Sequence, residues 1–161
     1  MKTLCLVRHG KAQGASETPS DFDRTLTDEG RDASKQIGAR LKQRGIVPDI
    51  IVVSPAPRAV ETAAIVADVL DIKPERIRWD ESLYDQPDDV LFEILRSLDN
   101  TVISVMIVAH EPSLSECIME LTGLKGIKLP TCGVAGISLD IAVWSGIAPK
   151  TGTLQWLETP D

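Results

Sequence analysis

Two histidines, His9 and His110, are the side chains of this sequence best suited to chemistry, and each stands at the end of a short apolar run. Arg8 precedes His9, and Arg58 comes shortly after another apolar run. A neutral imidazole with an ordinary pKa of about 6.5 is a usable nucleophile near neutral pH. The fork of an arginine guanidinium fits phosphate oxygens. If these four side chains meet, they form an anion site with a nucleophile beside it.

The elements that must position these residues are the apolar runs themselves, at 4–7, 50–53 and 102–109. Short, bounded runs with branched side chains are typical of fully buried strands. The carboxyl ends of parallel strands share one edge of a sheet, and α/β proteins keep their ligand crevices at that edge. We therefore expect Arg8, His9, Arg58 and His110 to converge there.

Between the apolar runs, the spacing of apolar residues predicts helices. Four helices are predicted. The first follows the cap Thr27 and runs to Arg44, the second runs from Pro57 to about Leu70, the third covers Asp88 to Leu98, and the fourth starts at Pro112. A polar loop at 10–25 is unusually long for a compact domain, and long loops are often functional. A further short strand is predicted at 77–79, and two or three more among the segments 134–139, 141–144 and 153–156.

Strands and helices alternate along the chain, which favours an α/β fold. The specific expectation is a three-layer sandwich with a mainly parallel central sheet, helices on both faces and an antiparallel edge near the C-terminus. With 161 residues, the chain fits a single domain covering 1–161.

The composition limits the partners. The formal net charge is −7, and no block of basic residues offsets it, which argues against nucleic acid and anionic membranes as partners. Three widely spaced cysteines do not suit a disulfide framework or a zinc cluster, so a cytoplasmic location is expected. The first residues lack the apolar core of a signal peptide, and no apolar run reaches the length of a membrane span.

Three motifs in this order resemble the histidine phosphatase superfamily, which has a phosphoglycerate mutase-like fold. They are Arg8-His9-Gly10, Ser54-Pro55 with Arg58 and Glu61-Thr62-Ala63, and Val108-Ala109-His110. Within this superfamily, the chain most resembles the small SixA-type phosphohistidine phosphatase branch. This likeness rests on the chain length, Leu26-Thr27-Asp28-Glu29-Gly30, the segment 129–135 and Gly152-Thr153-Leu154.

The resemblance implies that His9 is the nucleophile and is phosphorylated during the reaction. Arg8, Arg58 and His110 would bind the phosphoryl oxygens and neutralise their charge, without a metal or cofactor. The implied activity is hydrolysis of phosphohistidine on a protein such as a phosphorelay domain. These roles agree with the general needs of phosphoryl transfer, which are in-line positioning and stabilisation of charge.

The sequence leaves the roles of several residues open. Glu81 stands roughly where larger relatives keep the acid that protonates the leaving oxygen; the alternative is a solvated acid near a strand end. Ser16 is a candidate phosphate contact in the loop, as is Gln13, but both suit a purely local role in the loop. Lys11 and Glu111 depart from the family pattern, and a carboxylate at Glu111 would repel phosphate if it faced the site.

Two other functions compete with phosphohistidine hydrolysis. One is a phosphomonoesterase of the same superfamily acting on a small phosphorylated metabolite, which would need a working acid such as Glu81. The other is a phosphate-binding module without catalysis. Cys132 is not a candidate nucleophile, because the sequence has no third histidine to activate its thiol.

Overall fold

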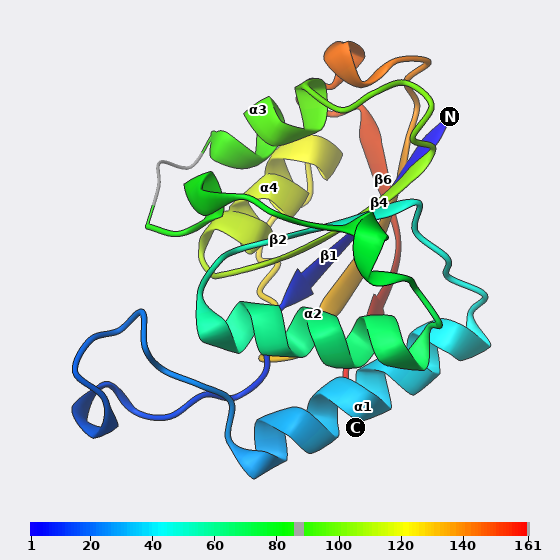
Figure 1. Cartoon of the computed structure of the whole chain (residues 1–161). Helices are drawn as coiled ribbons and strands as arrows, with labels where there is room; N and C mark the ends of the chain where they lie inside the picture. The colour runs from blue at the N-terminus through cyan, green and yellow to red at the C-terminus, as the bar shows by residue number, and fades with distance from the viewer. Residues whose placement is uncertain (86–88, 161) are drawn as a thin grey trace.

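The computed structural model of the chain describes residues 1–85 and 89–160. In these residues the strands form a six-stranded sheet in the order β3-β2-β4-β1-β5-β6 (Figure 1). The strands are β1 Lys2–Arg8, β2 Ile50–Val53, β3 Ile77–Trp79, β4 Ser104–Ala109, β5 Val134–Leu139 and β6 Gly152–Glu158. Strands β1 to β4 are parallel, whereas β5 pairs antiparallel with β1 and β6 pairs antiparallel with β5. The predicted mainly parallel sheet with an antiparallel C-terminal edge is confirmed.

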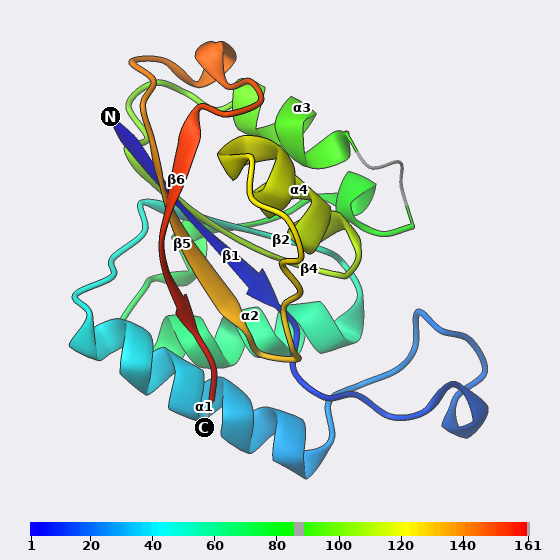
Figure 2. The ribbon, with the colours of Figure 1, turned by 180° about the vertical axis from the view of Figure 1, so that it is seen from behind.

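Helices cover both faces of this sheet (Figures 1 and 2). The helices are α1 Asp28–Gln43, α2 Pro57–Val69, α3 Val90–Arg96 and α4 Ser113–Thr122. Successive side chains of a strand point to opposite faces, so β1 contributes to two cores. Leu4 and Leu6 join the core under α3 and α4, while Cys5 and Val7 join the core under α1 and α2. The predicted three-layer arrangement is confirmed.

Local sequence explains where the helices begin. The Thr27 hydroxyl accepts a hydrogen bond from the Gly30 amide at 3.0 Å and caps α1. Pro57 begins α2, where its missing amide hydrogen is not needed. In the described residues, short 3₁₀ turns lie between the longer elements: η1 Ala15–Glu17, η2 Pro74–Arg76, η3 Glu81–Leu83 and η4 Trp144–Gly146.

The structure corrects the strand predicted at 141–144. Trp144 instead begins η4 and is fully buried, and its indole nitrogen donates to the Val102 carbonyl at 2.8 Å. That carbonyl also accepts from the Lys2 ammonium at 2.9 Å. Val102 lies just before β4, which begins at Ser104. The helix predicted over 88–98 is the shorter α3, and Asp88 lies outside the described residues.

The long loop 10–25 joins β1 to α1 and stands out from the sheet in both views (Figures 1 and 2). Hydrogen bonds hold its two ends together. The Gln13 amide nitrogen donates to the Thr25 carbonyl at 2.9 Å, and the Thr25 hydroxyl donates to Gln13 Oε1 at 3.0 Å. Among the described helices, none is long and apolar enough to cross a membrane.

Candidate active site

The three strands that end in the predicted site residues are neighbours in the sheet. In the order β2-β4-β1, Val53 lies opposite Val108, and Arg8 lies opposite Ala109. The residues that follow these positions therefore leave the sheet at the same edge. The predicted convergence of the strand ends is confirmed by this register.

His9 is held as a neutral imidazole whose lone pair is on Nε2. Its Nδ1 lies 2.7 Å from the Gly10 carbonyl, and since a carbonyl only accepts, Nδ1 carries the proton. The residue is only 8% exposed. Burial, together with the charges of Arg58 and Arg8, lowers the pKa of His9 to about 4, although the bond to Gly10 opposes this shift. At neutral pH Nε2 is therefore an unprotonated nitrogen of the kind that attacks phosphorus.

Arg58 lies in the first turn of α2, and its guanidinium faces His9. Its Nε donates to His9 Nε2 at 3.4 Å, and the side chain is almost fully buried. Thr62, one turn further along α2, donates to the Arg58 carbonyl at 2.8 Å and accepts from the Gly10 amide at 2.9 Å. This threonine therefore ties the start of α2 to the end of β1 and fixes the arginine relative to the imidazole.

His110 stands beside His9, with the two ring centroids 5.1 Å apart and the planes inclined by 58°. Its Nε2 lies 2.7 Å from the Ser54 hydroxyl. Its Nδ1 is buried and has no hydrogen-bond partner among the described residues. Burial and the neighbouring His9 and Arg58 lower the pKa of His110 to about 3. Because unpaired buried polar atoms are rare in folded proteins, this nitrogen is available for a ligand oxygen.

Arg8 ends β1, and one of its terminal nitrogens donates to the Leu129 carbonyl at 2.9 Å. Its Nε is buried and unpaired within the described part of the chain. The charge of Arg8 contributes to the low pKa of His9, so the two side chains share one electrostatic environment. Arg8 thus has donor capacity left for an anion.

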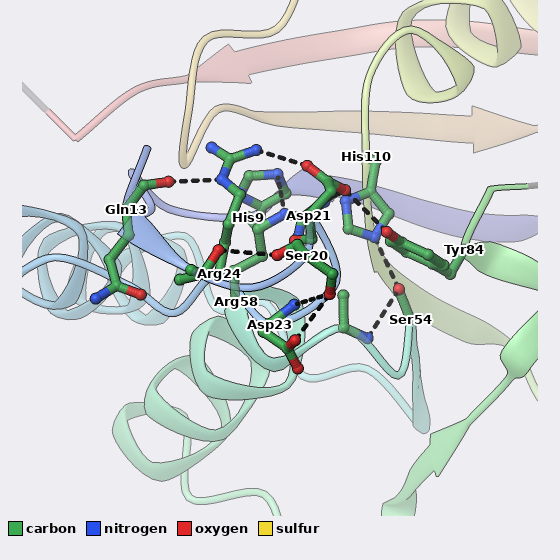
Figure 3. A network of polar contacts seen from close by, with 12 residues as sticks. His9, Gln13, Ser20, Asp21, Asp23, Arg24, Ser54, Arg58, Tyr84 and His110 are labelled. Carbon is green, nitrogen blue, oxygen red and sulfur yellow. Dashed lines mark hydrogen bonds and ion pairs between the residues drawn. The ribbon is translucent and has the colours of Figure 1, made fainter. Parts of the chain in front are cut away.

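Three further residues at this edge were not predicted from the sequence: Asp21 and Arg24 from the loop 10–25, and Tyr84 after η3 (Figure 3). The Asp21 carboxylate accepts from Arg24 Nη1 at 3.0 Å and from the Tyr84 hydroxyl at 2.8 Å. It also accepts from Arg58 Nη2 at 3.1 Å. Hydrogen bonds from Arg24 and Tyr84 lower the pKa of Asp21 to about 2. The only sequence signal for this group was the unusual length of the loop.

A cavity of about 250 Å³ opens beside His110. Its apolar wall contains Leu83, Val90, Leu91 and Pro112, and the carboxylates of Asp21, Asp85 and Glu111 line it as well. Glu111 is engaged at the start of α4, where it accepts from the Ser115 amide at 2.8 Å and from the Ser115 hydroxyl.

Within the described part of the chain, none of the remaining candidates forms a hydrogen bond or ion pair with either imidazole. Glu81 is exposed on η3 and is not among the described residues that line the cavity. Ser16 is exposed on η1, and Gln13 serves the loop by accepting from Arg24 and Thr25. Lys11 forms a surface ion pair with Glu29 at 2.9 Å. Within 1–85 and 89–160, no cluster of three or more His, Cys, Asp or Glu residues has the arrangement of a metal site.

Comparison with known proteins defines the class. Residues 4–86, just over half of the chain, match the family model of the histidine phosphatase superfamily (branch 1). The chain belongs to this superfamily, and the matched residues include Arg8-His9-Gly10 and Arg58.

The particular likeness is to SixA. The chain is 29% identical over 157 residues to phosphohistidine phosphatase SixA of Escherichia coli (strain K12), covering 96% of this chain and 92% of that protein. A structure of the protein histidine phosphatase SixA complexed with tungstate matches with a TM-score of 0.84 at 28% identity, over 98% of this chain and 97% of that one. Serine/threonine-protein phosphatase Pgam5 of Drosophila mojavensis is 36% identical over 75 residues, 47% of this chain and 25% of that protein. The chain is a SixA-like hydrolase of the histidine phosphatase superfamily.

Proposed function

We propose that this protein hydrolyses phosphohistidine on a protein substrate through a phosphorylated His9, without a metal ion. The observation that carries the proposal is the position of one neutral imidazole beside a second one and a buried arginine. His9 Nε2 lies 3.4 Å from Arg58 Nε, and the His110 ring centroid is 5.1 Å from that of His9. A phosphoryl group in line with Nε2 would be surrounded by cationic and hydrogen-bonding groups.

In the first step, the Nε2 lone pair of His9 attacks phosphorus, and the bond between phosphorus and the substrate imidazole breaks. Arg8, Arg58 and His110 stabilise the charge on the three equatorial oxygens. The proton of His9 stays on Nδ1 because Nδ1 donates to the Gly10 carbonyl. The substrate imidazole departs with a proton from solvent, and it is a better leaving group than an alkoxide.

In the second step, water attacks the phosphorus of phosphorylated His9. The N–P bond breaks, its electron pair returns to Nε2, and inorganic phosphate leaves. Approach of the phosphoryl group raises the pKa of His110 from its low value in the free enzyme, because an anion favours the imidazolium form. His110 Nδ1, which has no partner in the described chain, is the atom we assign to this donation.

Relatives support this choice of substrate. The E. coli protein that matches over nearly the full chain is a phosphohistidine phosphatase. The SixA structure with tungstate holds a tetrahedral oxyanion, which is the geometry that we assign to the site here. A phosphorylated histidine on a helix of a partner protein, as in a phosphotransfer domain, is the substrate class that we propose. Such a partner agrees with the expected cytoplasmic location.

The decisive assay uses a histidine phosphotransfer domain labelled with ³²P on its histidine. We expect the wild-type protein to release phosphate and His9→Ala to lose at least roughly 10³-fold in rate, because the nucleophile is gone. Lys11→Ala is the matched control, since Lys11 lies two residues away and pairs with Glu29 on the surface. No release by the wild type, or equal release by His9→Ala, would contradict the proposal.

Quenching in alkaline denaturant during turnover separates the enzyme from a non-catalytic binding module. We expect acid-labile ³²P on the wild-type chain and none on His9→Ala. A module that only binds phosphate would not acquire the label. The small-molecule phosphomonoesterase alternative predicts a similar label but faster turnover of simple esters than of the phosphorylated domain.

A further inference from the structure

An internal carboxylate lies on the donors that surround the proposed nucleophile. Asp21 accepts hydrogen bonds from Arg58 Nη2 and the Tyr84 hydroxyl through one oxygen, and from Arg24 Nη1 through the other. The Asp21 carbonyl accepts a further bond from Arg58 Nη1 at 2.8 Å. Figure 3 shows the carboxylate between Arg24, Arg58 and Tyr84 and next to the two imidazoles.

This arrangement gives each guanidinium nitrogen of Arg58 a partner within the protein. Its Nε faces His9 Nε2, and Nη1 and Nη2 both donate to Asp21. A phosphoryl group bound to His9 needs Arg58 for its own oxygens. A phosphate dianion and the Asp21 carboxylate on the same guanidinium would also repel each other strongly at close range. The phosphoryl group and the Asp21 carboxylate therefore compete for Arg58.

The loop 10–25 makes release of Asp21 feasible. The Asp21 side chain is 53% exposed although its partner Arg58 is buried, so the carboxylate regains water when it leaves. The loop ends are joined by Gln13 and Thr25, whereas Asp21 attaches the loop tip to α2 and to Tyr84. Phe22 adds an edge-on ring contact with Tyr84, with the centroids 5.0 Å apart. The tip can move without breaking the hydrogen bonds between the loop ends.

We infer that Asp21 is an internal competitor of the phosphoryl group, and that it sets the affinity of the site for phosphate. The inference rests on the proposed function, because it assigns the phosphoryl oxygens to Arg58. When inorganic phosphate forms, Asp21 takes back Arg58 and Tyr84 and so speeds product release. A substrate that gains contacts beyond its phosphoryl group, as a protein does, displaces the carboxylate more easily than free phosphate.

The test is calorimetric binding of inorganic phosphate to the wild type, Asp21→Asn and Asp23→Asn. Asp23 is the matched control, because it lies in the same loop and its carboxylate accepts from the Ser20 hydroxyl, away from Arg58. We expect Asp21→Asn to bind phosphate at least tenfold more tightly, and Asp23→Asn to stay within about twofold of the wild type. Inhibition of turnover by phosphate should strengthen in parallel for Asp21→Asn. Asp21→Ala, with thermal unfolding as a check of the fold, repeats the test without an amide at this position.

The outcomes separate the inference from the proposed function. Equal or weaker phosphate binding by both Asp21 variants would overturn the inference, since Asp21 would then support Arg58 and not compete with substrate. An equal gain in phosphate affinity in Asp23→Asn would also overturn it, because a general change in the loop would then explain the result. No phosphate binding by any of the proteins would overturn both the inference and the proposed anion site. If the wild type shows no turnover but the Asp21 variants still bind phosphate more tightly than it does, the inference stands and the proposed hydrolysis is contradicted.

Discussion

The candidate site has two halves that are built differently. The first half comes from the ends of β1, β2 and β4 and the start of α2, and its residues His9 and Arg58 are only 8% and 5% exposed. The second half comes from the loop 10–25, where Asp21 remains half in solvent. The sheet fixes the distances between the reacting groups, and the loop supplies a carboxylate that can move away from Arg58.

The difference matters because phosphoryl transfer depends mainly on how precisely the reacting groups are positioned. Hydrogen bonds with buried groups hold each imidazole: the Gly10 carbonyl accepts from His9, and the Ser54 hydroxyl pairs with His110. Asp21, in contrast, is held by side chains that the substrate also needs. Substitutions in the first half should therefore reduce turnover, whereas removing the charge of Asp21 should change mainly phosphate affinity.

Among the conservative substitutions that compare the two halves, the largest effect should come from Arg58→Lys. Lysine keeps the positive charge but cannot present a planar fork to two phosphoryl oxygens while it approaches His9 Nε2. We expect kcat/KM for a phosphorylated histidine domain to fall roughly 10²–10³-fold. Steady-state kinetics with the wild type and the variant measures this directly.

Arg40→Lys is the control for that substitution, because Arg40 pairs with Glu158 at 3.0 Å far along α1. It should change kcat/KM less than twofold. If Arg58→Lys behaved like Arg40→Lys, the buried half of the site would not be the catalytic half.

The second prediction concerns stability against pH. The folded-state pKa values of His9 and His110 lie at about 4 and about 3, below the ordinary value near 6.5. Below pH 6.5 the unfolded chain takes up protons that the folded chain refuses, so folding stability must fall as pH falls. Between pH 6.5 and 4.5 we expect a loss on the order of 2 kcal/mol for each histidine.

Denaturant unfolding across this pH window checks the prediction. The lowered pKa values of Asp21, Asp99 and Glu158 act mainly below pH 4.5, so they do not obscure it. His9→Asn and His110→Asn should each remove about half of the pH-dependent loss. A flat stability between pH 6.5 and 4.5 in the wild type would mean that neither imidazole is kept neutral by the fold.

The same division between sheet and loop decides what could be predicted from the sequence. His9, Arg58 and His110 were predictable because each follows an apolar run, and parallel strands bring their carboxyl ends to one edge. Asp21 and Tyr84 were not, because their contacts depend on the path of an irregular loop and on a turn after a short edge strand. The strand predicted at 141–144 was wrong since Trp144 is buried by packing and by its bond to Val102, which an apolar pattern does not distinguish from strand burial.

The third prediction tests how His110 is oriented. Ser54→Ala removes the hydroxyl 2.7 Å from His110 Nε2 and leaves the ring free to change tautomer. We expect kcat to fall about tenfold with little change in KM, because the hydroxyl does not contact substrate. Ser54→Thr, which keeps a hydroxyl, should restore most of the activity if the wider side chain is accommodated.

Ser34→Ala serves as the matched control for Ser54→Ala. Ser34 is also fully buried, and its hydroxyl donates to the Gly30 carbonyl within α1 at 2.8 Å. Both substitutions should lower the unfolding temperature by similar amounts, but only Ser54→Ala should lower kcat. Equal kcat values in the two variants would show that Ser54 has a purely structural role.

The smallest effect should come from Glu81→Gln. Glu81 is exposed on η3, and the acid nearest to it in sequence that lines the cavity beside His110 is Asp85. An imidazole leaving group needs little help from an acid, so we expect turnover of a phosphorylated histidine domain to change less than twofold. Asp85→Asn is the variant to compare with Glu81→Gln, because hydrolysis of a phosphate monoester releases an alkoxide that would depend on a nearby proton donor. Assays of both variants with the phosphorylated domain and with a simple phosphate monoester compare the two leaving groups. A loss of roughly 10²-fold in Glu81→Gln on the monoester would return Glu81 to the catalytic group and favour the small-molecule phosphomonoesterase.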